Sequence, residues 1–349
     1  MQRMKNSFIL IILGLFFLSV KSVSASYPQN IPKRFTAKIE IRVDLTQKGA
    51  DKETKLWLPY PVSTNYQKIS DISIRGSYDY MAIYSDAHGN DILFARWNEK
   101  TKEKKIYFSF LVTRRERVEH PPSSTTNCPN PLKETGPYLN LKALAAIPPQ
   151  LATLSATITQ NCKTPLEKAR AIFSWVTRNL KRDPRVQGCG SGDVCYVLER
   201  KAGKCADIHS VFVALLRAVN IPAREVYGLR LDAARKEADI TTWQHCWAEF
   251  YLPGYGWHAS DPADYLKALL EKNLNHDSPL AKEIWQYYWS RLDPFRVRLV
   301  TGRITKLNPP QSSAPLPYFM YPYAEVENEP VNPFDATNFH YSIRMKGVK

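Results

Sequence analysis

Residues 203–219, with the sequence GKCADIHSVFVALLRAV, place a cysteine immediately before a run of apolar residues that has the spacing of a helix. The apolar side chains recur every three or four residues, so they share one face of a helix from about Ala206 to Val219. Asn220-Ile221-Pro222 then stops this helix. We therefore expect Cys205 at the N-terminus of a long helix that packs in the core.

A helix N-terminus is a favourable position for a reactive thiol. Its dipole and its free amide groups stabilise a thiolate, and the same amides can donate hydrogen bonds to an oxyanion. Gly203 would allow the close backbone approach that this position requires. A buried, purely structural Cys205 is an equally good interpretation of the segment by itself.

A histidine and an aspartate further along the chain supply partners for this thiol. Residues 245–252 and 257–261 are predicted to be two strands, joined by a turn at Pro253-Gly254-Tyr255-Gly256. The hairpin would bring Asp261 beside His245. A carboxylate there would orient the imidazole and stabilise the imidazolium, which in turn favours the thiolate of Cys205. Taken singly, His245 could be an interior strand histidine and Asp261 a turn residue.

Together these segments resemble the transglutaminase-like superfamily, which shares a cysteine–histidine–aspartate arrangement with papain-like enzymes. The resemblance covers about residues 162–265. It is carried by Gly203-Lys204-Cys205-Ala206-Asp207, Ile221-Pro222-Ala223-Arg224, His245-x-Trp247-x-Glu249, Pro253-Gly254-Tyr255-Gly256-Trp257 and Asp261-Pro262. It implies a papain-like core with Cys205 as the nucleophile, His245 as the general base and acid, and Asp261 as the orienting residue. We expect no cofactor, no metal and no dependence on calcium.

The segments around this core complete an α+β protein. From Arg34 to Leu45 apolar and polar residues alternate, and four further stretches (55–58, 69–75, 92–97 and 105–113) have the composition of strands. Thr164-Pro165-Leu166-Glu167 is typical of a capped helix start. The Tyr318–Tyr323 stretch resembles the extensions found in exported bacterial members of the superfamily.

The predicted domain order has four parts. A signal peptide (1–25) precedes an antiparallel β domain (26–118), and a proline-rich linker (119–140) leads to the transglutaminase-like core with its C-terminal extension (141–349). The signal peptide is predicted from Arg3, Lys5, the apolar run Phe8–Val20 and the small residues before a cleavage site after Ala25. We therefore expect a periplasmic or secreted protein without a retained membrane segment, although an uncleaved anchor is an alternative.

The charge of the chain bears on its partners. Removal of residues 1–25 lowers the formal net charge from +15 to +12, which favours anionic surfaces. No nucleic-acid-binding motif is present, so the expected partners are protein or peptide substrates of the cell envelope.

The chain has six cysteines, and a nucleophile among them leaves an odd number. Cys189 and Cys195 bracket a short polar loop and could form a disulfide, and Cys128 could bridge to Cys162. Cys246 alternates away from His245 and is expected to be a small buried residue.

Several alternatives to this site were weighed. His209 would share the helix face of Cys205 and could touch the site. A zinc site would need Cys189, Cys195, Cys205, His209 and His245, which have neither CxxC nor HExxH spacing. No G-x-S-x-G motif for a serine hydrolase is present. Trp175 is expected in the core, and Tyr196 is a weak candidate for a second oxyanion donor.

The predicted reaction is attack of a cysteine thiolate on a carboxamide or peptide carbonyl, which gives a thioester. The acyl group then passes to an amine (transglutaminase-like transfer) or to water (cysteine protease or amidase). The sequence leaves this choice open. A catalytically silent module that binds an envelope protein or a glycan is the alternative from another class.

Overall fold

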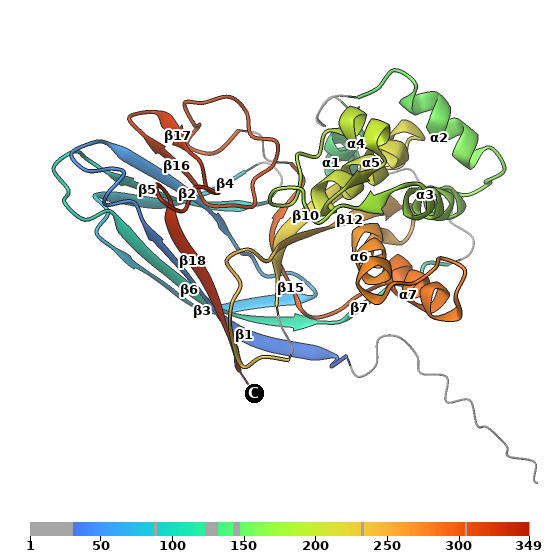
Figure 1. Cartoon of the computed structure of the whole chain (residues 1–349), viewed down its shortest axis with the longest axis horizontal. Helices are drawn as coiled ribbons and strands as arrows, with labels where there is room; N and C mark the ends of the chain where they lie inside the picture. Colours follow the sequence, from blue (N-terminus) through green and yellow to red (C-terminus); the bar gives the residue numbers. More distant parts are fainter. Residues whose placement is uncertain are drawn as a thin grey trace, which may run out of the picture.

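The computed structural model describes residues 31–86, 89–122, 132–141, 147–231, 234–303 and 306–348. The predicted signal peptide therefore lies outside the described residues. β layers gather at one end of the molecule and helices at the other (Figure 1). The fold is α+β, as predicted, with antiparallel sheets and helices that pack on one of them.

Two five-stranded antiparallel sheets form the β layers, in the orders β11-β18-β1-β6-β3 and β17-β16-β2-β5-β4. In β1 and β6 buried residues alternate with more exposed ones, which is the pattern of a strand with one buried face. The strands predicted before residue 118 are all present, and β4 is an additional one. Their bounds are β1 Arg34–Asp44, β2 Thr54–Tyr60, β3 Gln67–Gly76, β4 Tyr80–Ser85, β5 Asp91–Trp97 and β6 Lys105–Arg115.

The C-terminal segment completes these two sheets. β18 (His340–Val348) pairs with β1 along its whole length, and β16 (Tyr323–Val326) pairs with β2. β17 (Glu329–Val331) extends the second sheet, and β11 (Glu237–Asp239) extends the first. Residues 141–349 were predicted to form one core with its extension, but the C-terminal strands of this range cover sheet edges of the N-terminal part. Such pairing between distant segments satisfies exposed backbone groups and leaves no local signal.

The helical part of the molecule is built around α5 (Cys205–Ala218), in which every residue except Ala218 is buried. This helix packs on a four-stranded sheet with the order β13-β12-β10-β15. The strands are β10 Ala223–Arg230, β12 Gln244–Leu252, β13 Gly256–Ser260 and β15 Arg296–Thr301. A helix buried on all sides is normally apolar, so the buried Asp207, His209 and Ser210 of α5 indicate a polar site within it.

Four helices pack against α5: α2 (Leu151–Thr159), α3 (Pro165–Asn179), α4 (Val194–Arg200) and α6 (Pro262–Lys272). α7 (Pro279–Ser290) packs against α6. The capping box predicted for α3 is present: Thr164 Oγ1 accepts a hydrogen bond from the Glu167 amide at 3.2 Å, and Glu167 Oε2 accepts one from the Thr164 amide at 3.1 Å. No helix within the described ranges is long and apolar enough to cross a membrane.

Short elements connect these layers. Part of the predicted linker forms α1 (Leu132–Thr135) and the 3-10 helix η1 (Gly136–Leu139). β7 (Arg117–Val118) pairs with β14 (Arg291–Leu292), and β8 (Lys181–Arg182) pairs with β9 (Ala202–Gly203) directly before Cys205.

Candidate active site

Cys205 is the first residue of α5, as the sequence predicted. The carboxylate of Asp207 fixes this helix start, because it accepts hydrogen bonds from the amides of Lys204 and Gly192, both at 2.9 Å. Gly190 has a φ of +97°, and a Cβ added there would lie 2.0 Å from Asp207 Oδ2. A glycine is therefore required where the loop before α4 passes the start of α5.

Three other side chains surround the sulfur of Cys205. Hydrogen bonds from the thiols of Cys189 and Cys246, and from His245, hold the pKa of Cys205 well below its usual range despite burial. The contact with Cys205 and burial raise the pKa of Cys189, while burial and the same contact raise that of Cys246. These contacts favour the thiolate form of Cys205.

His245 and Asp261 lie beside Cys205, so the structure brings all three predicted site residues together. His245 Nε2 is 2.8 Å from Asp261 Oδ2, which leaves Nδ1 as the ring nitrogen that faces Cys205. Burial and the positive charge of Arg230 lower the pKa of His245, although Asp261 opposes them. Ala248 and Ser260 form the last pair of the β12–β13 hairpin, and Asp261 is the next residue after it.

Asp261 also caps α6 and binds a second histidine. Its Oδ1 accepts a hydrogen bond from the Asp264 amide at 2.8 Å and lies 3.2 Å from His209 Nε2. His209 is fully buried, and its Nδ1 lies 3.3 Å from Cys246 Sγ. His209 thus touches the site by holding the carboxylate, and Cys246 is a polar contact of the site as well as a buried residue.

Arg296, which the sequence analysis missed, is the positive charge that keeps Asp261 ionised. Its guanidinium is fully buried, contacts Asp261 Oδ2, and lies 2.8 Å from His245 Nε2. It also donates to Asp264 Oδ2 at 2.7 Å and to Asp293 Oδ2 at 3.0 Å. Burial would raise the pKa of Asp261, but Arg296 and His245 hold it well below its usual range. β15 has the sequence Arg-Val-Arg-Leu-Val-Thr, with two arginines, so nothing in the strand itself marks Arg296 as the one that reaches Asp261.

The donor atoms of His245, Asp261 and Asp264 lie within 4.8 Å of one another and could in principle hold a metal ion. Arg296 already donates to both carboxylates, so a cationic group fills the position that an ion would take. The zinc set considered from the sequence does not come together in the described part of the chain: Cys195 is partly exposed on α4 and belongs to no such group.

The disulfide between Cys189 and Cys195 is a wrong prediction. Both are free thiols, because Cys189 turns inward against Cys205 while Cys195 lies partly exposed on α4. Cys162 is also free, and Cys128 lies outside the described residues. The Tyr196 hydroxyl accepts a hydrogen bond from Arg200 on the surface, so it does not suit an oxyanion donor.

The C-terminal aromatic stretch covers the thiols. Tyr318 donates a hydrogen bond to the carbonyl of Gly190 at 2.5 Å, and Tyr321 contacts Cys189. The exposed fraction of Cys205 is 2%, so the nucleophile is less accessible than its predicted role suggests. An acyl donor must therefore displace some of the surrounding side chains to reach the sulfur.

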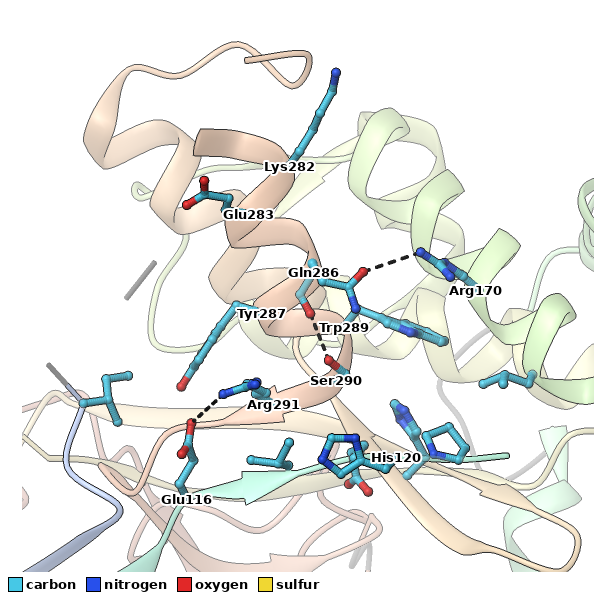
Figure 2. Close-up of a pocket in the computed structure, with 16 residues that line it drawn as sticks. Glu116, His120, Arg170, Lys282, Glu283, Gln286, Tyr287, Trp289, Ser290 and Arg291 are labelled. Carbon is cyan, nitrogen blue, oxygen red and sulfur yellow. Dashed lines mark hydrogen bonds and ion pairs between the residues drawn. The ribbon is translucent and has the colours of Figure 1, made fainter. Parts of the chain in front are cut away.

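A separate cavity of about 1090 Å³ lies away from these residues. It is lined mainly by α7, α3 and the β7–β14 pair, and none of Cys205, His245 and Asp261 contributes to it. Figure 2 shows that Arg170 reaches Gln286 across it, at 3.5 Å, and that Arg291 faces Glu116 at 3.7 Å. These two contacts hold neighbouring segments of the chain together, and none of the four side chains in them is a nucleophile.

Comparison with known proteins points to the same part of the chain as the geometry of the site. The model of the transglutaminase-like superfamily matches residues 152–262, which include all three predicted site residues. An uncharacterized protein of Haemophilus influenzae is 32% identical over 324 residues, which is 86% of this chain and 88% of that protein. The uncharacterized protein YebA of Bacillus subtilis is 28% identical over 130 residues, 34% of this chain and 18% of YebA.

The crystal structure of a candidate cysteine protease from Cytophaga hutchinsonii shares the fold. It has a TM-score of 0.50 and 15% sequence identity, and the match covers 91% of this chain and 99% of that one. The chain belongs to the transglutaminase-like superfamily.

We predict that iodoacetamide labels Cys205 through a thiolate with a lowered pKa. The labelling rate should reach half of its maximum at a pH below about 8.5, the value of an ordinary thiol, because a lowered pKa shifts ionisation to more acidic pH. Mass spectrometry of peptides from samples labelled across a pH series measures this, with the partly exposed Cys195 as an internal control. A midpoint at or above that of an ordinary thiol would argue against the nucleophile.

Proposed function

We propose that this protein is an exported cysteine-nucleophile enzyme that transfers acyl groups from protein or peptide carboxamides or amides through a thioester. The observation that carries the proposal is the contact of Cys205, a thiol with a lowered pKa at a helix N-terminus, with an imidazole held by Asp261. Substrates from the cell envelope are proposed on the strength of the predicted export and the positive net charge.

The first half of the reaction forms the thioester. The Cys205 thiolate attacks the carbonyl carbon, a C–S bond forms, and the electron pair moves to the carbonyl oxygen. The Cys205 amide at the N-terminus of α5 is the proposed donor to this oxyanion, since the next amide, of Ala206, already donates to the Cys189 carbonyl at 2.9 Å. His245, which received the thiol proton, gives it to the departing nitrogen as the C–N bond breaks. Ammonia or an amine leaves.

The second half returns the enzyme to its starting state. An amine or a water molecule attacks the thioester carbon, and His245 accepts a proton from it. The C–S bond then breaks and Cys205 leaves as a thiolate. Asp261 neither gains nor loses a proton in these steps, because it only orients the imidazole and stabilises its positive charge.

Transfer to an amine is our first candidate, because the burial of Cys205 restricts the approach of water to the thioester. Proteolysis or amide hydrolysis is the second candidate. The fold is shared with the Cytophaga protein described as a candidate cysteine protease, which supports it. A silent binding module would form no covalent intermediate at all.

We predict a graded loss of thioester formation in three variants. Cys205→Ala and His245→Ala each remove a chemical step and should abolish it, whereas Asp261→Ala should retain part of the rate, since it removes only orientation and charge stabilisation. Mass spectrometry of the acyl-enzyme with a glutamine-containing peptide measures the rate, and circular dichroism checks folding. Added amine then separates the acceptors, since cross-linked product indicates transfer and free acid indicates hydrolysis.

Two outcomes would contradict this assignment. Wild-type rates in His245→Ala would point to another base, for which His209 is the nearest candidate. The absence of any covalent adduct on wild-type Cys205, with every peptide and envelope protein offered, would favour the binding module.

The proposed export rests on the N-terminal sequence pattern of residues 1–25. We predict that protein isolated from the cell envelope begins at Ser26, which N-terminal sequencing determines. Recovery of chains that still begin at Met1 in washed membranes would mean that the segment is retained as an anchor.

A further inference from the structure

A second polar cavity, of about 610 Å³, lies where the β layers meet the catalytic sheet. β6, β7 and the segment before β3 line one side, and β10, β12, β13 and β15 line the other. Its charged residues are Arg114, Arg117, Arg224, Arg298, Glu119 and Glu249. Four arginines thus share the cavity with two glutamates.

Both glutamates are fully engaged by two of these arginines and by neutral donors. Glu249 accepts hydrogen bonds from Arg117 at 2.7 Å and from Arg224 at 2.9 Å. Burial would raise the pKa of Glu249, but Arg224, Arg117 and Arg298 lower it to about 2, so it is charged. Glu119 lies 2.6 Å from Arg117 Nε and accepts from the Tyr255 hydroxyl and the Ala259 amide.

Arg114 and Arg298 make no direct ion pair among the described residues, although the charge of Glu249 acts on both. Among the described residues neither guanidinium has an ion pair or a hydrogen bond, and the Nε atom of each is buried and unpartnered. Arg114 is only 3% exposed. Burial, together with the charges of Arg117 and Arg296, lowers the pKa of Arg114 to about 9. A buried charge of this kind is costly unless a partner binds it.

The other two buried polar atoms of the lining that lack a hydrogen bond are also donors. Trp247 Nε1 is buried without a hydrogen-bond partner. Arg117 Nε makes no hydrogen bond of good geometry either, although it faces Glu119. Since no buried side-chain acceptor among the described residues that line the cavity lacks a partner, a ligand that completes this site must be rich in acceptors and negatively charged.

We propose that this cavity binds a small oxyanion with two negative charges, carried by a phosphate ester or a dicarboxylate. Arg114 and Arg298 supply the charge that matches it, and guanidinium groups suit the oxygen pairs of both ligand types. The cavity is within the usual size range of small-molecule sites, so it has room for more than the anionic group.

The site adjoins the catalytic centre through two strands. Trp247 follows His245 by two residues in β12, and Arg298 follows Arg296 by two residues in β15, so the members of each pair share a face of their strand. The charge of Arg296 already acts on Arg114. A bound dianion therefore lies in the electrostatic surroundings of the residues that hold Asp261 and His245.

Calorimetric titration of the whole protein with sodium phosphate and with sodium glutarate tests the proposal, against sodium chloride at equal ionic strength and pH. We expect saturable binding of at least one dianion and a higher unfolding temperature in its presence. Tighter binding of phosphate would assign a phosphate ester, and tighter binding of glutarate a dicarboxylate. The absence of saturable binding of both would overturn the proposal.

Two variants and a matched control locate the binding. Arg114→Gln and Arg298→Gln should each weaken the affinity for the dianion about tenfold or more, because each removes a hydrogen bond from a charged donor. Arg75→Gln removes the same charge from an exposed position on β3 and should bind as the wild type does. Without ligand, Arg114→Gln should unfold at the same temperature as the wild type or higher, because an uncompensated buried charge is removed. Wild-type affinity in both cavity variants would contradict the assignment.

Discussion

The buried carboxylate of Asp261 is the interaction on which the catalytic part depends. It is fully buried and receives His209 from α5, His245 from β12 and Arg296 from β15, and it caps α6. Burial of a single carboxylate is costly, so it is tolerated only because these partners surround it. One charged group thereby fixes the relative positions of two helices and two strands, and these elements carry the thiol and the imidazole.

The same carboxylate acts on the thiol through His245, in addition to the hydrogen bonds from Cys189 and Cys246. A charged Asp261 stabilises an imidazolium at His245, and that positive charge favours a thiolate at Cys205. Arg296 keeps Asp261 ionised, whereas burial and the charge of Arg230 lower the pKa of His245. Cys189 and Cys246 stabilise the sulfur of Cys205 by hydrogen bonds.

Local patterns in the sequence were sufficient for much of this arrangement. The helix start at Cys205, the hairpin between His245 and Asp261, and the capping box at Thr164 depend on residues close in the chain. Contacts between distant segments were not predictable in the same way. The pairing of β18 with β1 and the approach of Arg296 to Asp261 have no local signature, and the disulfide prediction failed because spacing alone does not give the direction in which Cys189 turns.

The most direct test of this account is a titration of the Cys205 thiolate by its ultraviolet absorbance, in the wild type and in Asp261→Asn. The same titration in Cys205→Ser backgrounds subtracts the other thiols. We predict that the pKa of Cys205 lies below that of an ordinary thiol in the wild type and rises in Asp261→Asn, because the amide no longer stabilises the imidazolium. An unchanged pKa in Asp261→Asn would contradict the claim that Cys205, His245 and Asp261 act as one unit.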